Sequence, residues 1–418
     1  MEDSSNSPAA TLCASESLRA AADRHRSAVL AVLSPGQGAQ TPGMLAPWLE
    51  RPGAQELVER WSQLTGLDLV RLGTTADAAE IKDTAITQPL IVVAGLLAAR
   101  ELGLLNDGGR EFFVAAGHSI GEVTAAAVAG VLSPDDAVVL AARRGAAMAE
   151  ACNAVPTSMS AVLGGDADAV VEAIEGLGLT AANRNAAGQI VAAGAIDALA
   201  ALAADPPAGA RVRPLEVAGA FHTSYMASAQ SALAEAAATM PVSDASHALL
   251  SNFDGRAVTD GAEFMARLVA QVTTSVRWDL CQQTLRDIGV DTVIELAPGG
   301  TLVGMAKREM PGVTLQAIKS PADLDAARAL LAHATAGAQG GHTPDLQILV
   351  APAKGVFTRA EGIEEGATVA AGAILGTVRT NSDSHDLVSP FSGVLDEWVR
   401  HDGDIVGVGL PLARLSSS

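Results

Sequence analysis

Cysteine and aromatic residues are scarce in this chain of 418 residues, which has three cysteines and 3% Phe, Trp and Tyr. Cys13, Cys152 and Cys281 are too few and too far apart for a disulfide framework or a zinc site. We therefore expect no metal centre, and a location in the reducing cytoplasm. With few large side chains and 41 glycines, the core is expected to consist of closely packed small residues.

Long apolar segments and an excess of positive charge are also missing. The longest apolar run, residues 89–99, is well short of the roughly 20 residues that cross a bilayer. No apolar stretch follows the polar residues 1–7, as it would in a secretory signal. Aspartate and glutamate outnumber lysine and arginine by 47 to 27, which gives a net charge of −20. This balance argues against nucleic acid or an anionic membrane as a partner.

The chain has a hydrophobic content of 49%, which is enough to form a core. Its length suggests two to three domains at roughly 150 residues each. We expect a flexible N-terminal tail over residues 1–27 and an α/β domain with a parallel sheet over residues 28–334. A linker of Gly and small residues over 335–345 then leads to a small C-terminal domain over 346–418.

A smaller unit is expected within the α/β domain. Between about residues 158 and 217 the sequence pattern runs as strand, helix, two strands, helix and strand. This order is typical of a ferredoxin-like fold and predicts a subdomain inserted into the larger one. The alternative is that these elements continue the main sheet.

One short motif contains the candidate nucleophile. Residues 117–121 read Gly-His-Ser-Ile-Gly, the G-x-S-x-G pattern that places a serine on a tight turn from a strand to a helix. The preceding residues 111–116 predict a buried strand and the following Ala-rich stretch predicts a helix, as the motif requires. Ser119 then needs a base. His222, in a loop ahead of a helix, is a better candidate than His118, although alone it would be read as a surface histidine.

Seven separated motifs occur in order along the α/β domain. They are Pro-Gly-Gln-Gly-Ala-Gln at 35–40, Gly-His-Ser-Ile-Gly-Glu at 117–122, Arg144-Gly145, Asn185 with Gly188-Gln189, Ala220-Phe221-His222, Gln271 with Val276-Arg277-Trp278, and Ala297-Pro298-Gly299. Together they resemble the malonyl-CoA:acyl carrier protein transacylases, the acyltransferases of type II fatty acid synthesis. The resemblance covers about residues 28–334 and implies an α/β-hydrolase-like acyltransferase core.

The resemblance implies a catalytic role for five residues. Ser119 is acylated, and His222 takes its proton as the general base. The backbone carbonyl of Gln271 orients this histidine in place of a triad aspartate. The backbone N–H groups of Gln37 and Ile120 form the oxyanion hole.

The resemblance also implies the substrates. Arg144 matches a carboxylate with its planar guanidinium fork, which selects a dicarboxylic thioester such as malonyl-CoA. Phe221, Asn185 and Gln271 belong to the substrate pocket, where Phe221 closes the space of an α-methyl branch. The malonyl group passes through a malonyl-serine ester to the phosphopantetheine thiol of acyl carrier protein by a ping-pong mechanism. No cofactor is implied, and the product supplies fatty acid or polyketide synthesis.

Other functions stay open on the sequence alone. A methyl group in a pocket is worth about 1 to 3 kcal/mol, so methylmalonyl-CoA is an alternative substrate. A thioesterase-type serine hydrolase shares the G-x-S-x-G motif but needs no carboxylate-binding arginine. A catalytically silent scaffold needs none of Ser119, His222 and Arg144. Carrier proteins of this pathway are acidic, as this chain is. Arg277, Lys307 and Arg308 are candidates for a local basic patch that receives the carrier, or they are ordinary surface charges.

The C-terminal segment contains a weak internal repeat. Ala-Pro-Ala-Lys-Gly-Val at 351–356 is similar to Ser-Pro-Phe-Ser-Gly-Val at 389–394. Residues 346–415 thereby resemble a biotinyl/lipoyl carrier domain, a small all-β hammerhead or flattened barrel. The position expected to carry the modified lysine is Ser382, and no lysine follows Lys354. We therefore expect neither biotin nor lipoate, and a role in packing, oligomer contacts or partner docking.

Overall fold

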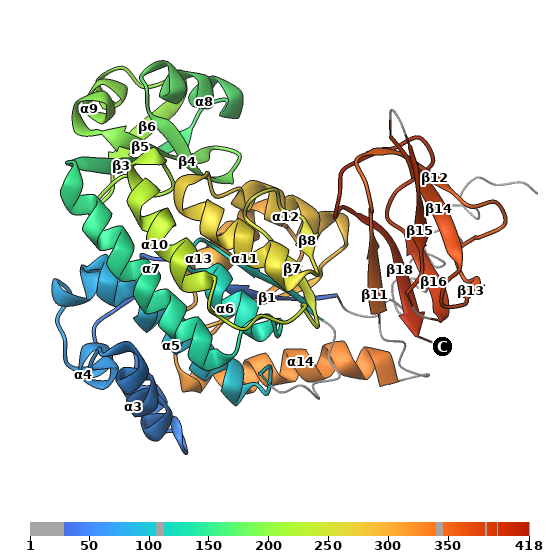
Figure 1. The fold of residues 1–418 in the computed structure, drawn as a ribbon, viewed down its shortest axis with the longest axis horizontal. Coiled ribbons are helices and arrows are strands. Elements are labelled where there is room, and N and C mark those ends of the chain that lie inside the picture. Colours follow the sequence, from blue (N-terminus) through green and yellow to red (C-terminus); the bar gives the residue numbers. More distant parts are fainter. Residues whose placement is uncertain (1–28, 106–112, 340–345, 381–382, 391, 418) are drawn as a thin grey trace, which may run out of the picture.

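A computed structural model describes residues 29–105, 113–339, 346–380, 383–390 and 392–417. The structure has three regions (Figure 1). A large α/β body carries a smaller α/β unit at one end, and an all-β unit formed by the C-terminal part of the chain lies at another side of the body. The expected tail lies outside the described residues, as does most of the segment between the body and the all-β unit.

Six strands form the central sheet of the body, in the order β10, β9, β1, β2, β7, β8. Their bounds in that order are Thr314–Ala317, Thr292–Glu295, Leu30–Ser34, Val114–Gly117, Ala248–Leu250 and Ala257–Val258. The first five run parallel, but β8 pairs antiparallel with β7. The prediction of a parallel sheet is therefore wrong at this edge, where the sheet is mixed. The short turn between β7 and β8 cannot hold the long crossover that a parallel pair needs.

Helices cover both faces of the central sheet, because alternate side chains of a strand point to opposite faces and both faces here are apolar. In β1, Leu30 and Val32 join the larger buried cluster, whereas Ala31 and Leu33 join a second cluster on the other face. The larger cluster includes residues of α2 (Ala46–Leu49), α3 (Ala54–Thr65), α4 (Leu69–Thr74), α5 (Thr84–Glu101), α6 (Gly121–Val128), α7 (Pro134–Ala154), α10 (Ala227–Ala237), α11 (Gly261–Ala270) and α14 (Leu324–Gln339). The second includes residues of α12 (Trp278–Asp287) and α13 (Thr301–Glu309).

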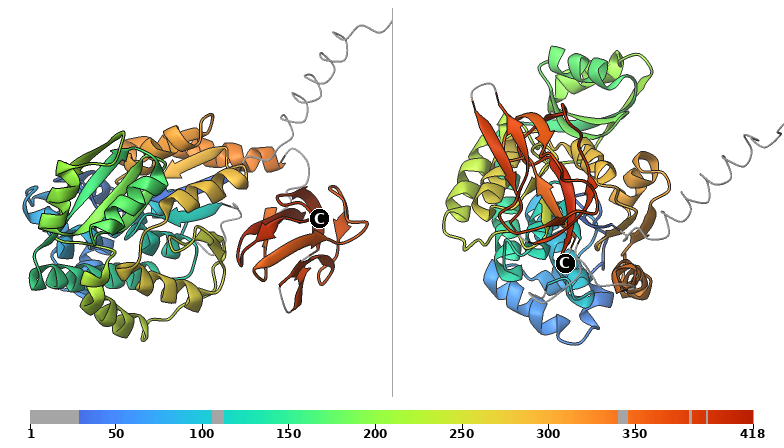
Figure 2. Two further views of the ribbon diagram at one scale, coloured as in Figure 1. Left: turned by 90° about the horizontal axis from the view of Figure 1, so that it is seen from above. Right: turned by 90° about the vertical axis from the view of Figure 1, so that its right-hand side faces the viewer.

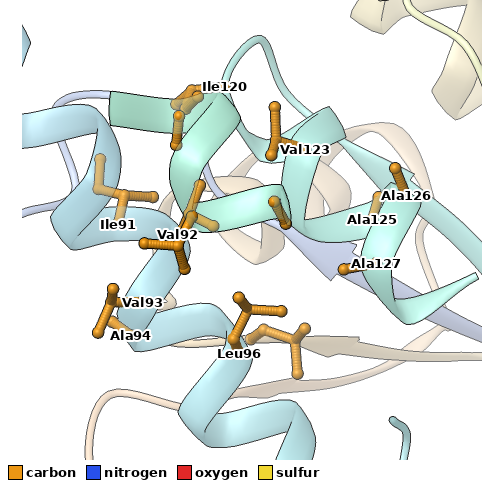
Figure 3. Close-up of a cluster of buried hydrophobic side chains, with 14 of the residues drawn as sticks. Ile91, Val92, Val93, Ala94, Leu96, Ile120, Val123, Ala125, Ala126 and Ala127 are labelled. Atoms are coloured by element: carbon orange, nitrogen blue, oxygen red, sulfur yellow. The ribbon is translucent and has the colours of Figure 1, made fainter. Parts of the chain in front are cut away.

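The helices α5 and α6 pack tightly beneath the turn that follows β2. Figure 3 shows the apolar side chains Ile91, Val92 and Leu96 of α5 beside Ile120 and the residues of α6. α5 is buried on nearly all sides, which marks it as a core helix. Even so, no helix in the described ranges is long and apolar enough to cross a membrane. The turn that contains Ser119 is thus supported by closely packed apolar side chains.

The smaller unit has an antiparallel sheet of its own, in the order β4, β5, β3, β6, with a separate apolar cluster. Along the chain its elements are β3 (Thr157–Gly164), α8 (Ala167–Gly176), β4 (Thr180–Ala186), β5 (Gln189–Ala195), α9 (Ile196–Ala204) and β6 (Ala210–Pro214). These strands do not extend the central sheet, so the alternative reading of this segment is wrong.

The C-terminal unit consists of two four-stranded sheets packed over a core that contains Phe357 and Trp398. Its strands are β11 (Leu346–Val350), β12 (Gly355–Arg359), β13 (Thr368–Val369), β14 (Ile374–Arg379), β15 (Ser384–Val388), β16 (Gly393–Trp398), β17 (Ile405–Val406) and β18 (Pro411–Ser417). Arg400 of this unit forms an ion pair with Asp287 of α12, with an N–O distance of 2.9 Å. Figure 2 shows the unit beside the body in the left-hand view and in front of it in the right-hand view.

The linker expected over residues 335–345 is shorter than predicted. α14 continues to Gln339, and only residues 340–345 of the predicted linker lie outside the described ranges. The cause is local, because Ala334, Ala336 and Ala338 are strong helix formers. Two of the glycines that suggested a linker, Gly340 and Gly341, follow this helix directly in the sequence.

Candidate active site

Ser119 lies on the turn between β2 and α6 and has a left-handed backbone, with φ of 54°. The turn is steep enough to require a glycine on each side. A Cβ at Gly117 would come within 2.1 Å of the carbonyl of Gly121, and a Cβ at Gly121 within 2.2 Å of the carbonyl oxygen of Ser34. Left-handed backbone is unfavourable for a residue with a side chain, so this turn holds Ser119 in a strained conformation.

His222 lies directly beside Ser119. Its Nε2 is 2.8 Å from Ser119 Oγ, and its Nδ1 is 2.8 Å from the backbone carbonyl oxygen of Gln271. A carbonyl accepts only, so Nδ1 carries the proton and the lone pair of Nε2 faces the hydroxyl. Burial lowers the pKa of His222 to about 3, and the nearby charge of Arg144 adds to the effect. The imidazole is therefore neutral at physiological pH, with the lone pair of Nε2 directed at the serine hydroxyl.

Arg144 is buried beside the same serine. It lies on α7, which begins with a helix-start sequence: Ser133 caps the helix by accepting the Asp136 N–H, and Pro134 is its first residue. The guanidinium donates to Gln88 Oε1 at 2.7 Å, to Gln271 Oε1 at 2.9 Å and to Ser119 Oγ at 3.3 Å.

The charge of Arg144 has no carboxylate partner in direct contact among the described residues, and its Nε lacks a hydrogen-bond acceptor there. Burial lowers the pKa of Arg144 to about 10, which leaves it charged at neutral pH. Buried charges are normally paired. A cation that is held only by neutral oxygens is suited to binding an anionic group brought by a ligand.

Ser119, His222 and Arg144 share a cavity of about 150 Å³ between the body and the smaller unit. This volume is below the roughly 300 Å³ of sites for drug-sized ligands, so the cavity suits a short acyl group. At its edge Lys82 of the body and Glu216 of the smaller unit form an exposed ion pair at 2.8 Å. The remaining lining includes Gln37, Gln88, Ile120, Met148, Met159, Asn183, Val191, Leu215, Val217 and Phe221.

Comparison with known proteins agrees with this geometry. Residues 32–320 match the family model described as the acyl transferase domain. The chain belongs to this acyl transferase family. It is 57% identical over 297 residues to the malonyl CoA-acyl carrier protein transacylase of Mycobacterium bovis, covering 71% of this chain and 98% of that protein. The Escherichia coli protein of the same name is 34% identical over 304 residues, again covering 71% and 98%.

Solved structures show the same similarity. The crystal structure of MCAT from Mycobacterium tuberculosis matches with a TM-score of 0.69 at 56% identity, covering 71% of this chain and 99% of that one. A structure described as a type II PKS acyl-carrier protein in complex with its malonyl-transacylase matches with a TM-score of 0.66 at 28% identity, covering 72% and 99%. The all-β unit lies beyond the residues that match the acyl transferase model.

The other predicted site residues of this acyl transferase take different places. Phe221 and the oxyanion candidates Gln37 and Ile120 line the cavity. Asn185, which we expected in the pocket, lies behind it and holds His118, with Oδ1 2.8 Å from His118 Nε2. Asn183, two residues earlier in β4, is the asparagine that lines the cavity.

Two of the three cationic residues expected to receive the carrier donate hydrogen bonds to neighbouring side chains. Arg277 is held by two hydrogen bonds to Asp279, and Arg308 donates to Gln189 at 2.6 Å. Lys307 lies on the exposed side of α13. Across the described residues no group of three or more His, Cys, Asp or Glu side chains is placed to hold a metal ion.

Three residues in contact with this site were missed by the sequence analysis. Gln88 contacts Arg144, and Asn252 binds the backbone N–H of Ser119 through Oδ1 at 2.9 Å. Glu122 is fully buried and contacts the side chain of Gln271. Only Glu122 had a signal in the sequence, because it is the single charged residue in α6 and directly follows the elbow. Gln88 and Asn252 belong to unremarkable segments and reach the site only through the fold.

Proposed function

We propose that this chain transfers the malonyl group from malonyl-CoA to the phosphopantetheine thiol of acyl carrier protein, supplying fatty acid or polyketide synthesis. The assignment is supported by the relatives of 57% identity that bear this name. The observation that carries it is the buried Arg144, which lies against the nucleophile Ser119 without a carboxylate partner in the described structure. A malonyl thioester brings the reactive carbonyl and the missing carboxylate in one group.

The first half of the reaction follows from the pair Ser119 and His222. As Ser119 Oγ attacks the thioester carbonyl, His222 Nε2 takes the hydroxyl proton. The tetrahedral intermediate then collapses, the carbon–sulfur bond breaks, and the CoA thiol leaves with the proton from His222. The carbonyl of Gln271 stabilises the imidazolium formed in between. The developing oxyanion lies at the N–H groups of Gln37 and Ile120, which border the cavity.

The second half repeats these steps in reverse. The carrier's phosphopantetheine thiol gives its proton to His222 and attacks the malonyl-serine ester, and Ser119 regains the proton as the ester bond breaks. Water is the competing nucleophile, and its attack would make the protein a thioesterase. A carboxylate that stays bound to Arg144 holds the ester in place for the thiol.

Selectivity among acyl groups is assigned to Arg144 and Phe221. The guanidinium favours malonyl over acetyl because only malonyl supplies a carboxylate. The ring of Phe221, buried at the cavity wall, fills the space that the α-methyl of methylmalonyl would need. Discrimination against one methyl group is limited to about 1 to 3 kcal/mol, so methylmalonyl-CoA is expected to be a slow substrate.

Brief mixing with malonyl-CoA, followed by intact-protein mass spectrometry, tests the proposal directly. We expect one malonyl adduct that disappears when a pantetheinylated carrier protein is added. Ser119→Ala should form no adduct. Ser160→Ala, which removes a buried serine of β3 outside the cavity lining, should behave like the natural chain. Rapid loss of the adduct as free malonate without any carrier would contradict the proposal.

The acid side of the pH profile gives a second test. Because burial lowers the pKa of His222 to about 3, the base stays neutral far below the roughly 6.5 of an exposed histidine. We expect kcat/KM for the malonyl transfer to show no inflection near pH 6.5. The lowered pKa also makes the stability of the fold depend on pH. As the pH falls below about 6.5, the histidine binds a proton in the unfolded chain but not in the folded chain, so the free energy of unfolding decreases. Half-loss of activity near pH 6.5, with the fold intact, would contradict this assignment.

The domain organisation is part of the proposal. We infer a ferredoxin-like subdomain over about residues 158–217, supported by its strand order of second, third, first and fourth. A hammerhead of the biotinyl/lipoyl type over residues 346–418 is supported by two facing four-stranded sheets. Ser382, at the expected attachment position, lies outside the described residues. Since no lysine follows Lys354, amide attachment of biotin or lipoate at that tip has no acceptor.

A further inference from the structure

Glu122 is the common acceptor for two groups that build the site. Its carboxylate is 1% exposed and lies in the first turn of α6, three residues after the nucleophile. Oε2 accepts the side-chain N–H of Gln271 at 2.5 Å, and Oε1 accepts the backbone N–H of Asn252 at 2.5 Å. Neither donor belongs to α6, so Glu122 ties two distant segments to the helix that carries Ser119.

The side-chain amide of Gln271 points its Nε2 at three acceptors, of which Glu122 Oε2 is the nearest. The other two are Asn252 Oδ1 at 3.1 Å and the backbone carbonyl oxygen of Ser119 at 3.4 Å. Since Gln271 Nε2 faces the carboxylate of Glu122, its Oε1 must face Arg144, which donates to it at 2.9 Å. The reverse orientation would place an N–H against a guanidinium. The backbone carbonyl of the same Gln271 accepts from His222. One residue thus links Glu122 to both the anion-binding cation and the general base.

The contact of Glu122 with Asn252 helps to fix the turn that contains Ser119. Asn252 Oδ1 accepts the N–H of Ser119 at 2.9 Å, and its Nδ2 donates to the carbonyl of Gly117 at 2.7 Å. Its own backbone carbonyl accepts from Arg277 at 2.8 Å. With three of its groups bound in this way, Asn252 has little freedom to move. The side chain of Gln271 is the more adjustable of the two partners of Glu122.

We propose that Glu122 is a positioning residue for malonyl transfer: by orienting the amide of Gln271 it holds Arg144 in the arrangement that receives the malonyl carboxylate. The proposal rests on the proposed function and adds a residue to it. Both neighbours are donors, and an acceptor with two free oxygens, the carboxylate form of Glu122, satisfies them together. Burial raises the pKa of Glu122 to about 8, against the lowering effects of the Asn252 N–H and the charge of Arg144, so the test below is made above that pH. A glutamine at this position satisfies one donor and opposes the other with its own N–H.

Glu122→Gln, which keeps size and shape, tests the proposal. Because Asn252 is fixed, we expect the new amide oxygen to face Asn252 and the new NH₂ to face Gln271 Nε2, which loses its nearest acceptor. Repulsion between the two NH₂ groups then displaces the Gln271 amide from the position in which its Oε1 accepts from Arg144. The expected loss is about 10- to 100-fold in kcat/KM for malonyl-CoA, as for removal of a hydrogen bond to a charged group. The preference for malonyl over acetyl should fall by the same factor, because acetyl transfer makes no use of the guanidinium.

A matched control is available in the same body. Glu295 is also fully buried and accepts the backbone N–H groups of Gly300, Leu302 and Val303 at 2.8 to 2.9 Å, but it does not line the cavity. Glu295→Gln should lower the melting temperature and leave the malonyl preference unchanged. If Glu122→Gln lowers only the melting temperature, or lowers malonyl and acetyl transfer by equal factors, the proposal is wrong.

Two further measurements keep the test decisive. If Glu122→Gln does not fold, Gln271→Met removes the same link while keeping the backbone carbonyl for His222, and the same fall in malonyl preference is expected. An unchanged preference in Gln271→Met overturns the proposal. The natural chain must first form the malonyl adduct at Ser119, and absence of that adduct contradicts the proposed function itself. A different result contradicts only the inference about Glu122. It is a normal adduct in the natural chain together with an unchanged preference for malonyl over acetyl in Glu122→Gln.

Discussion

Replacing His222 by alanine lowers kcat/KM for malonyl transfer by about two to four orders of magnitude, the range expected for loss of a general base. His222 Nε2 is 2.8 Å from Ser119 Oγ, and no other imidazole contacts this oxygen in the described structure, since His118 is held by Asn185. Without the base, the hydroxyl must lose its proton to water. Stopped-flow measurement of adduct formation at Ser119 checks the result.

The control for this substitution is a second histidine, which is partly buried. His247 stacks on Phe113 with ring centroids 4.0 Å apart and lies outside the cavity lining. His247→Ala should change the melting temperature and leave the rate of adduct formation within about twofold. A His222→Ala protein that keeps more than about a tenth of the natural rate would show that the proton goes elsewhere.

Replacing Arg144 by alanine should change the substrate preference more than any other single substitution in the cavity. Malonyl transfer is expected to lose about 10- to 200-fold in kcat/KM, since a hydrogen bond to a charged group contributes about 1.5 to 3 kcal/mol. Acetyl transfer should change little, because acetyl has no carboxylate to bind. Parallel kinetics with malonyl-CoA and acetyl-CoA measure the ratio directly.

The neighbouring residue on α7 provides the control for Arg144. Arg143 has the same side chain but lies on the exposed side of the helix, so Arg143→Ala should leave both rates unchanged. Equal losses for malonyl and acetyl in Arg144→Ala would mean that the guanidinium serves the serine or the fold rather than the carboxylate. The hydrogen bond from Arg144 to Ser119 Oγ, at 3.3 Å, makes this a real alternative for the experiment to exclude.

The sequence predicted Ser119 and His222 as a catalytic pair, and the structure brings the two side chains into contact. The residues that hold them were not predicted. Ser119 and His222 could be found because each lies in a short motif, and the fold places them together although 103 residues separate them. Gln88 and Asn252 have no motif of their own; an amide becomes functional only where the fold brings it against a charge or a backbone N–H. Asn185 shows the same limit, because a motif can mark an asparagine without showing which side of the pocket it lies on.

The fold was predictable where local pattern decides it. The order of elements in the smaller unit follows from periodicity and turn residues, and the start of α7 follows from Ser133 and Pro134. The antiparallel edge strand β8 has only two residues, too few to show a period. The end of α14 depended on competition between alanines, which favour helix, and glycines, which end it.

The left-handed backbone of the two candidate catalytic residues has a consequence for evolution. Ser119 and His222, at φ of 54° and 60°, are the only residues other than glycine in the described structure with positive φ. Each such conformation costs about 1 to 3 kcal/mol, and glycine would adopt either one without that cost. With respect to this backbone cost, selection for thermal stability favours glycine at both positions. Selection for the proposed roles of Ser119 and His222 in acyl transfer acts against that replacement, so backbone stability and activity oppose each other at these two residues.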